Sequence, residues 1–527
     1  MTVLARLRLA ALLIAAALAS GCAAPLPAVD RTALASEALP GSDQSPLGLI
    51  VKNSTPAGEH SGLRLMPLGK FSIDTRLELA RRAVASLDLQ YYHLEPDDTG
   101  RTLLRALRDA AERGVRVRLL LDDYYLGGHD ELFLGLAAHP NVELRLFNPF
   151  VRLREQGQTA RFVFSFDWPR LNHRMHNKMF IADGVAAVVG GRNIADEYFL
   201  RSSTDNFVDM DAFVVGKVVE PLAALFDRYW NSAPVFPLHS VARSSLDAAA
   251  LRAAFEAATD PERLSPPPPL PPNDILGYGP IRDDLDDGRL GLHWGEAYAF
   301  ADHPDKPFDG EVGGELLETS VTYNIMEPLL KARREVLISN PYFVPGPQGM
   351  ALLKALRDKG VKVTVLTNGL GATDEPVVHI GYSRYRGEML RMGVEIFELS
   401  NSLIKQNTRM FHFGSGLGRL HAKLFVVDKQ LSFIGSMNFD PRSATINTEF
   451  GMIVDSVPLA RELTRVIDLD RLQSAYKLRL RADGQCCEWL TDDDEGKMRV
   501  LYEEPDTDPS IRLKLMLLAP LVPDELL

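Results

Sequence analysis

One short sequence pattern occurs twice in this chain. Residues 176–183 read HNKMFIAD and residues 421–428 read HAKLFVVD, so both copies follow H-x-K-x-x-x-x-D. In both copies, a turn of small residues begins seven residues after the Asp and ends in Asn. Two copies with the same companions at one offset of 245 residues indicate an internal duplication. The shared residues are His176, Lys178, Asp183 and Asn193, then His421, Lys423, Asp428 and Asn438.

The spacing within each copy suits a strand that ends at a phosphate site. Residues 179–182 and 424–427 are short apolar runs, as expected of strands buried on both faces. Side chains alternate along a strand, so the His and the Lys two places later point to the same side. An imidazole beside an ammonium suits a tetrahedral oxyanion, glycine turns allow close backbone approach, and each Asn adds an amide donor. Two such units would supply a nucleophile, a general acid and a charge clamp.

The surrounding sequence predicts that the duplication covers whole domains. RALRDAAERGVRV (105–117) and KALRDKGVKV (354–363) differ by a three-residue deletion. Alternating strands and helices predict an α/β fold of two duplicated lobes, each a mixed or parallel sheet flanked by helices. The elements expected in the first lobe are a strand at 89–92, a helix at 101–113 and a strand at 115–121, and their counterparts are 336–338, 348–359 and 361–366.

The paired motif resembles the hallmark of the phospholipase D superfamily. In that family two similar lobes share one active site, where one His attacks phosphorus and the other protonates the leaving alcohol. Water or a second alcohol then releases the phosphoryl group from the histidine. The resemblance implies His176 as nucleophile and His421 as general acid. It also implies phosphate binding by Lys178, Lys423, Asn193 and Asn438, with no metal and no cofactor.

A narrower resemblance, over most of residues 75–480, is to bacterial cardiolipin synthases of the C type. The segments that carry it include VVGGRNIADEYF (188–199), SNPYFVPG (339–346) and IGSMNFDPRSATINTE (434–449). The resemblance implies transfer of a phosphatidyl group to phosphatidylglycerol, with phosphatidylethanolamine as a second possible substrate.

Other functions remain open at this point. Water could replace the lipid alcohol, which would make the protein a hydrolase that releases phosphatidic acid. The superfamily also contains nucleases, but a net charge of −12 and a pI near 5.6 lack the basic character of a nucleic-acid binder. A non-catalytic envelope lipoprotein is disfavoured because both motifs are intact.

Each catalytic imidazole needs a carboxylate to fix its tautomer and stabilise its charged form. In the second copy, Glu449 lies 28 residues beyond His421 and opens an apolar strand. The equivalent place in the first copy is Asp209, which family comparison favours over Asp211. The motif residues Asp183 and Asp428 end their strands and are predicted to have structural roles.

The N-terminus resembles a bacterial lipoprotein signal. Arg6 and Arg8 precede about a dozen apolar residues, and small residues lead to Cys22. Acylation of Cys22 would hold the protein on a membrane of the cell envelope, facing the periplasm, with the outer membrane possible. An ordinary signal peptide or a short anchor with an incidental Cys is the alternative.

The rest of the chain divides by composition. The run 511–518 could lie on a membrane surface or pack as a terminal element. The adjacent Cys486 and Cys487 are not expected to bridge, and no spacing suggests a zinc site. The predicted segments are 1–22 (signal), 23–61 (linker), 62–240 (first domain), 241–312 (proline-rich linker or insertion), 313–480 (second domain) and 481–527 (tail).

Overall fold

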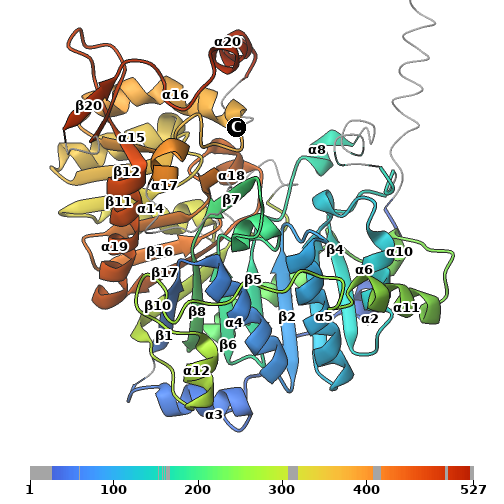
Figure 1. Ribbon diagram of the computed structural model, residues 1–527. Helices are drawn as coiled ribbons and strands as arrows, with labels where there is room; N and C mark the ends of the chain where they lie inside the picture. Colours follow the sequence, from blue (N-terminus) through green and yellow to red (C-terminus); the bar gives the residue numbers. More distant parts are fainter. Residues whose placement is uncertain are drawn as a thin grey trace, which may run out of the picture.

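The computed structural model describes two lobes that lie side by side, the first coloured blue to green and the second mainly yellow to red in Figure 1. The residues described are 26–522, except 59, 152, 157, 159–160, 162–166, 307–318, 407–416 and 493–496.

The first lobe is built on one mixed sheet. Its strands lie in the order β9-β4-β3-β2-β5-β6-β8-β1. The neighbours β2, β3 and β4 are parallel, and parallel neighbours need crossover connections, which α5 (Asp98–Glu112) and α6 (Asp130–Ala137) provide. The strands are β1 (Ser61–Met66), β2 (Ser86–Tyr91), β3 (Arg116–Asp122), β4 (Val142–Phe147), β5 (Met179–Ala182), β6 (Ala186–Gly190), β8 (Asp211–Gly216) and β9 (Val235–Pro237).

The second lobe repeats this arrangement. Its strands lie in the order β18-β13-β12-β11-β15-β16-β17-β10, and β11, β12 and β13 are parallel. Helices α15 (Gly346–Asp358) and α16 (Pro376–Arg391) make the crossovers. The predicted duplication is therefore confirmed strand by strand. The strands are β10 (His293–Ala301), β11 (Glu335–Ser339), β12 (Lys362–Asn368), β13 (Glu395–Leu399), β15 (Lys423–Val427), β16 (Leu431–Gly435), β17 (Phe450–Asp455) and β18 (Ala475–Arg479).

Strand β10 corrects the predicted domain boundary. It pairs with β17 in the second sheet as β1 pairs with β8 in the first, and it also pairs with β1. It is therefore the first strand of the second lobe and joins the two sheets, and the prediction of a linker is wrong for residues 293–301. Most of its side chains are half-buried or exposed, so its hydrophobic pattern is weak. Within the same predicted linker, α11 (Ala248–Ala258) and α12 (Ile281–Asp286) pack on the first lobe through Phe255 and Leu285.

The described part of the predicted N-terminal linker is also packed. It contains α2 (Arg31–Leu34) and α3 (Pro46–Ser54), and Leu47 enters the core of the first lobe. The Arg31 guanidinium donates to the carbonyl oxygens of Ser232 and Val235 over 3.0 and 2.9 Å. The predicted signal and Cys22 lie outside the described residues. None of the helices in the described ranges has the length and apolar character needed to cross a bilayer.

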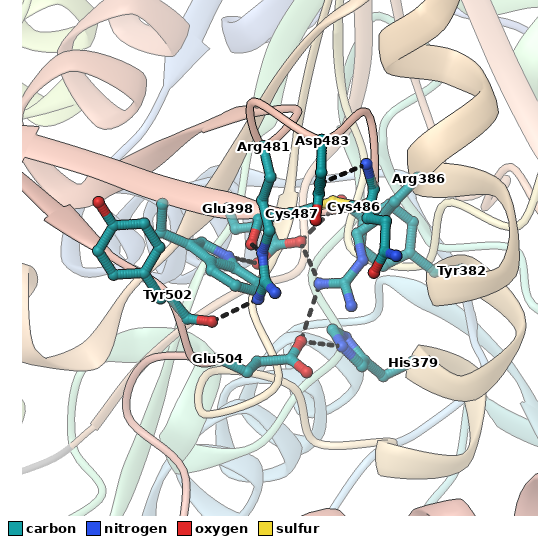
Figure 2. Close-up of a disulfide and its surroundings, with 12 residues drawn as sticks. His379, Tyr382, Arg386, Glu398, Arg481, Asp483, Cys486, Cys487, Tyr502 and Glu504 are labelled. Atoms are coloured by element: carbon teal, nitrogen blue, oxygen red, sulfur yellow. Dashed lines mark hydrogen bonds and ion pairs between the residues drawn. A yellow bond between two sulfur atoms is a disulfide. The ribbon is translucent and has the colours of Figure 1, made fainter.

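The C-terminal segment extends the second sheet. Strands β19 (Glu488–Asp492) and β20 (Met498–Leu501) follow β18 in antiparallel order. Buried polar contacts fasten this extension to α16, as Figure 2 shows. Arg386 donates to Glu398 and Glu504 over 3.0 and 2.9 Å, and Trp489 donates to Glu398 over 2.7 Å.

The expectation that the adjacent cysteines stay unbridged is contradicted. Cys486 and Cys487, just before β19, form a disulfide (Figure 2). The bond joins chain neighbours, whereas a disulfide restricts the unfolded chain mainly by closing a long loop. These two cysteines therefore provide no link between distant segments of the described fold.

Candidate active site

Two backbone bridges place the motif histidine of each lobe against the opposite lobe. Strands β7 (Asp205–Val208) and β14 (Leu417–Leu420) pair in parallel, and the backbone N–H of His421 donates to the carbonyl of Val208 over 2.8 Å. At the second bridge, the backbone N–H of His176 donates to the carbonyl of Thr448 over 2.8 Å. In each case the acceptor is the residue directly before the predicted carboxylate.

The two imidazole–carboxylate pairs cross between the lobes. His421 Nδ1 lies 2.7 Å from Asp209 Oδ2, and His176 Nδ1 lies 2.9 Å from Glu449 Oε2. The sequence analysis identified both carboxylates but grouped each with the motif of its own copy. The parallel bridges instead place each carboxylate beside the histidine of the other copy. An ionised carboxylate only accepts, so Nδ1 carries the hydrogen and the Nε2 lone pair is left for chemistry.

Both imidazoles favour the neutral form in the described site. Burial, followed by the charges of Lys178 and Lys423, lowers the pKa of His176 well below its usual range. Burial and Lys423 lower the pKa of His421 to about 4, although Asp209 and Asp374 act in the opposite direction. A neutral imidazole is the form that can attack phosphorus.

The two carboxylates differ in how firmly they hold a negative charge. Burial acts to raise the pKa of Asp209, but His421 and Lys423 outweigh it and hold that pKa at about 2. Burial raises the pKa of Glu449 to about 7, although Lys178 acts to lower it. His421 therefore faces a fixed anion that stabilises its protonated form, whereas His176 faces a carboxyl group that gives up its proton less readily.

The two motif lysines are buried cations. Lys178 Nζ donates to the carbonyl oxygen of His176 over 2.5 Å, and Lys423 Nζ donates to that of His421. Burial lowers the pKa of Lys178 well below its usual range and that of Lys423 to about 8. The charge of Lys423 also lowers the pKa of Lys178, and both lysines lower the pKa of His176. Because burial disfavours both ammonium groups, an anion bound in the site would stabilise them, and a phosphate group supplies one.

The two predicted asparagines are buried. The Asn193 amide nitrogen donates to the Tyr198 hydroxyl over 2.8 Å. The side-chain oxygens of Asn193 and Asn438 have no hydrogen-bond partner among the residues that the structure describes. In the first turn, Gly191 makes room for a catalytic carboxylate, since a Cβ there would lie 2.2 Å from Asp209 Oδ1.

The motif aspartates Asp183 and Asp428 each accept hydrogen bonds from three backbone N–H groups. The Asp183 carboxylate accepts from the backbone N–H groups of Val84, Ala85 and Ser86 over 2.8–3.1 Å. Asp428 does the same for residues 333–335 in the second lobe. Each therefore ties the end of its motif strand to the segment that enters the neighbouring strand.

Several residues that support the site were not predicted. Ser436 Oγ donates to Glu449 Oε2, and Asp302 Oδ2 accepts from the backbone N–H of Glu449 over 2.9 Å. Across the interface, Arg442 donates to Asn172 Oδ1 over 2.8 Å. The sequence did contain a signal for Ser436, since this residue lies inside the repeated turn. It contained no signal for Asp302, which follows a strand that the sequence analysis assigned to a linker.

Aromatic side chains border both histidines. The rings of Tyr92 and His176, and those of Tyr198 and His421, meet edge to face with centroids 5.1 Å apart. Tyr91 and Phe343, by contrast, are buried in the hydrophobic cores of the first and second lobes.

Comparison with known proteins identifies the family. The family model described as "Cardiolipin synthase, PLD-like domain" matches residues 77–230 and 325–471. The chain is 38% identical over 460 residues to Cardiolipin synthase C of Escherichia coli (strain K12), which covers 84% of this chain and 92% of that protein. It is 24% identical to a Cardiolipin synthase of Staphylococcus aureus (strain Mu50 / ATCC 700699), over 82% of this chain and 72% of that protein.

A solved structure shares the fold. The phosphatidylserine synthase of Haemophilus influenzae Rd KW20 superimposes with a TM-score of 0.57 at 12% identity, over 91% of this chain and all of that chain. The duplicated lobes, the paired motifs and these matches agree. The chain is an enzyme of the phospholipase D superfamily, and it belongs with the bacterial cardiolipin synthases of the C type.

Proposed function

We propose that this enzyme makes cardiolipin by transferring a phosphatidyl group to the glycerol hydroxyl of phosphatidylglycerol. The observation that carries the proposal is the crossed pairing of His176 with Glu449 and His421 with Asp209. It leaves two Nε2 atoms for chemistry beside two buried lysines. The similarity to Cardiolipin synthase C of Escherichia coli over most of both chains supports a lipid substrate.

In the first step, Nε2 of neutral His176 attacks the phosphorus of the donor lipid. The phosphorus–oxygen bond to the leaving alcohol breaks, and that oxygen takes the Nε2 proton of His421. A bound phosphodiester anion opposes the charge of Lys423, which lowers the pKa of His421, so substrate favours the protonated acid. Lys178 and Lys423 stabilise the charge that builds on the phosphoryl oxygens.

In the second step, His421, now neutral, removes the proton from the acceptor hydroxyl. The hydroxyl oxygen attacks phosphorus, the bond to His176 breaks, and both histidines return to their starting forms. Water can take the place of the lipid alcohol, so selection of the acceptor depends on limiting water in the site.

Expression in a bacterial strain that lacks its own cardiolipin synthases tests the proposal. Wild-type protein should restore cardiolipin, measured by mass spectrometry of extracted lipids, and the His176→Ala and His421→Ala proteins should not. An increase in phosphatidic acid without cardiolipin would establish a hydrolase instead. Phosphatidylethanolamine as the second lipid is tested by labelling its phosphatidyl group and following the label into cardiolipin.

We also propose that acylated Cys22 tethers the enzyme to a membrane of the cell envelope on the periplasmic side. The lipoprotein-like sequence before Cys22 supports this placement. Metabolic labelling with a fatty acid should mark the wild-type chain and leave Cys22→Ala unlabelled. Labelling that persists in Cys22→Ala would contradict the anchor.

A further inference from the structure

Helix α20 (Pro509–Leu518) presents apolar side chains to solvent. None of its ten residues is buried against the described part of the protein. Its five large apolar exposed residues have between 41% and 66% of their surface accessible. Such a concentration within eight positions indicates a binding surface rather than ordinary surface variation. These residues are Ile511, Leu513, Met516, Leu517 and Leu518.

The helix is nevertheless fastened to the second lobe. Arg384 of α16 donates to the carbonyl oxygens of Ala519 and Val522, both over 2.7 Å. Arg512 donates to Glu503 over 2.8 Å, and the next residue, Glu504, accepts from Arg386 and pairs with His379 (Figure 2). The helix is therefore held in a defined position against α16, and its apolar side chains are exposed to solvent.

A second exposed apolar residue belongs to a helix on the same side of the molecule. Trp168, in the short helix α8 (Trp168–Leu171), has 52% of its surface accessible. Figure 1 shows α20 over the second lobe and α8 over the first, both at the upper side of the molecule, with α3 at the lower end.

Both features adjoin segments that lead into the active site. Helix α8 ends five residues before His176. On the other lobe, Asp374, whose charge acts on His421, lies two residues before α16, which seats α20.

We propose that α20 and Trp168 dock on the headgroup boundary of a phospholipid bilayer and so orient the active site toward it. This inference rests on the proposed function, in which the substrates are membrane lipids. A ten-residue helix is about 15 Å long, half of the roughly 30 Å hydrocarbon core, so it lies on the membrane. The exposed side chain of Lys514 stands among the apolar side chains, where its aliphatic stem can lie along the apolar layer while the ammonium stays in water. Because the whole chain carries a charge of −12, apolar insertion is the main attraction and docking persists in high salt.

Fluorescence quenching measures the docking directly. Full-length Leu517→Trp protein is mixed with vesicles of phosphatidylglycerol and phosphatidylethanolamine that carry brominated acyl chains. The added fluorescence, relative to the parent chain, should be quenched at low and high salt. The matched control is Leu49→Trp, at an exposed leucine of α3, and its fluorescence should not be quenched because Figure 1 shows helix α3 at the opposite end of the molecule from α20. Absence of quenching at position 517 would overturn the proposal. A fluorescence change that depends on protein concentration when no vesicles are present would also overturn it, because it would indicate that α20 binds a second copy of the chain.

A kinetic test separates docking from chemistry. The Leu513→Glu/Leu517→Glu protein should lose about tenfold or more in kcat/KM on vesicles, since burying one leucine is worth about a factor of ten. With short-chain phosphatidylglycerol dissolved below its micelle concentration, the kcat/KM of the double variant should equal that of the parent protein. The control Leu49→Glu should have the kcat/KM of the parent protein on both substrates. Unchanged activity on vesicles, or equal losses on both substrates, would refute docking by α20. Failure of the parent itself on both substrates would refute the proposed function, while the quenching experiment would still report docking.

Discussion

His421 Nδ1 lies 2.7 Å from Asp209 Oδ2, although 212 residues separate the two along the chain. The matching pair, His176 and Glu449, crosses the interface in the opposite direction. Each lobe therefore supplies a histidine and lysine of its own and the carboxylate for the histidine of the other lobe. Neither lobe contains a complete catalytic pair.

Replacing either motif histidine should abolish transfer. We expect His176→Ala and His421→Ala each to lower kcat by about 10³-fold or more, because one step loses its nucleophile and the other its proton donor. Rates are measured with labelled phosphatidylglycerol in vesicles. The control His129→Ala changes a histidine in the loop before α6 and should retain activity. Near-normal turnover in either motif variant would contradict the shared site.

The crossed carboxylates should act through the opposite lobe. Asp209→Asn should lower kcat by about 10²–10⁴-fold, because an amide can neither fix the His421 tautomer nor stabilise its charge. A phosphatidyl adduct trapped in this variant should be on His176, and its release should be slowed. Peptide mapping of the acid-labile adduct checks both points. An adduct on His421 would reverse the assigned roles.

Activity should fall on the alkaline side as Lys423 loses its proton. Burial lowers the pKa of this lysine to about 8, so the cation that attracts phosphate is present below that pH and disappears above it. We expect kcat/KM to decrease above about pH 8, mainly through a higher KM. Lys423→Arg keeps its charge at all these pH values and should flatten the decrease, even if its activity is lower overall. Lys429→Arg, at an exposed lysine that pairs with Glu335, should leave the profile unchanged.

The two motif aspartates should affect stability unequally. Asp183→Ala should lower the free energy of unfolding by about 2–3 kcal/mol, because it leaves the buried N–H of Ser86 and the part-buried N–H of Ala85 without an acceptor. Asp428→Ala should cost about 1 kcal/mol, because solvent reaches the amides of Arg333 and Arg334. Urea unfolding followed by circular dichroism measures both. Equal losses would show that burial does not set the difference.

Transfer should proceed without a divalent metal. Lys178 and Lys423 supply the positive charge that phosphate chemistry otherwise takes from a metal ion. Excess chelator should leave the initial rate within about twofold of the untreated enzyme, in the range expected when no electrostatic stabilisation is lost. Loss of activity that one particular metal restores would show that the lysines are not sufficient.

The segments that sequence reasoning misjudged share a physical cause. Strand β10 has a mostly half-exposed pattern, and its identity as a strand comes from backbone pairing with β1 and β17 on either side. The Ala- and Pro-rich residues after 26 have little hydrophobic signal, yet Arg31 holds them through carbonyl groups of the first lobe. Contacts of this kind depend on which backbone groups lie opposite in the folded protein, and amino-acid composition carries no information about that.

The sequence by itself determined the duplication, the alternation of strands and helices, and the residues His176, Lys178, His421 and Lys423 as one chemical unit. Periodicity and repeated spacing are local properties, so they are readable along the chain. The tertiary structure alone decided which carboxylate serves which histidine. That choice follows from the register of β7 against β14 and of Met175 against Thr448, which places Asp209 and Glu449 beside imidazoles more than 200 residues away. Register between lobes is set by the packing of whole sheets, and no local pattern encodes it.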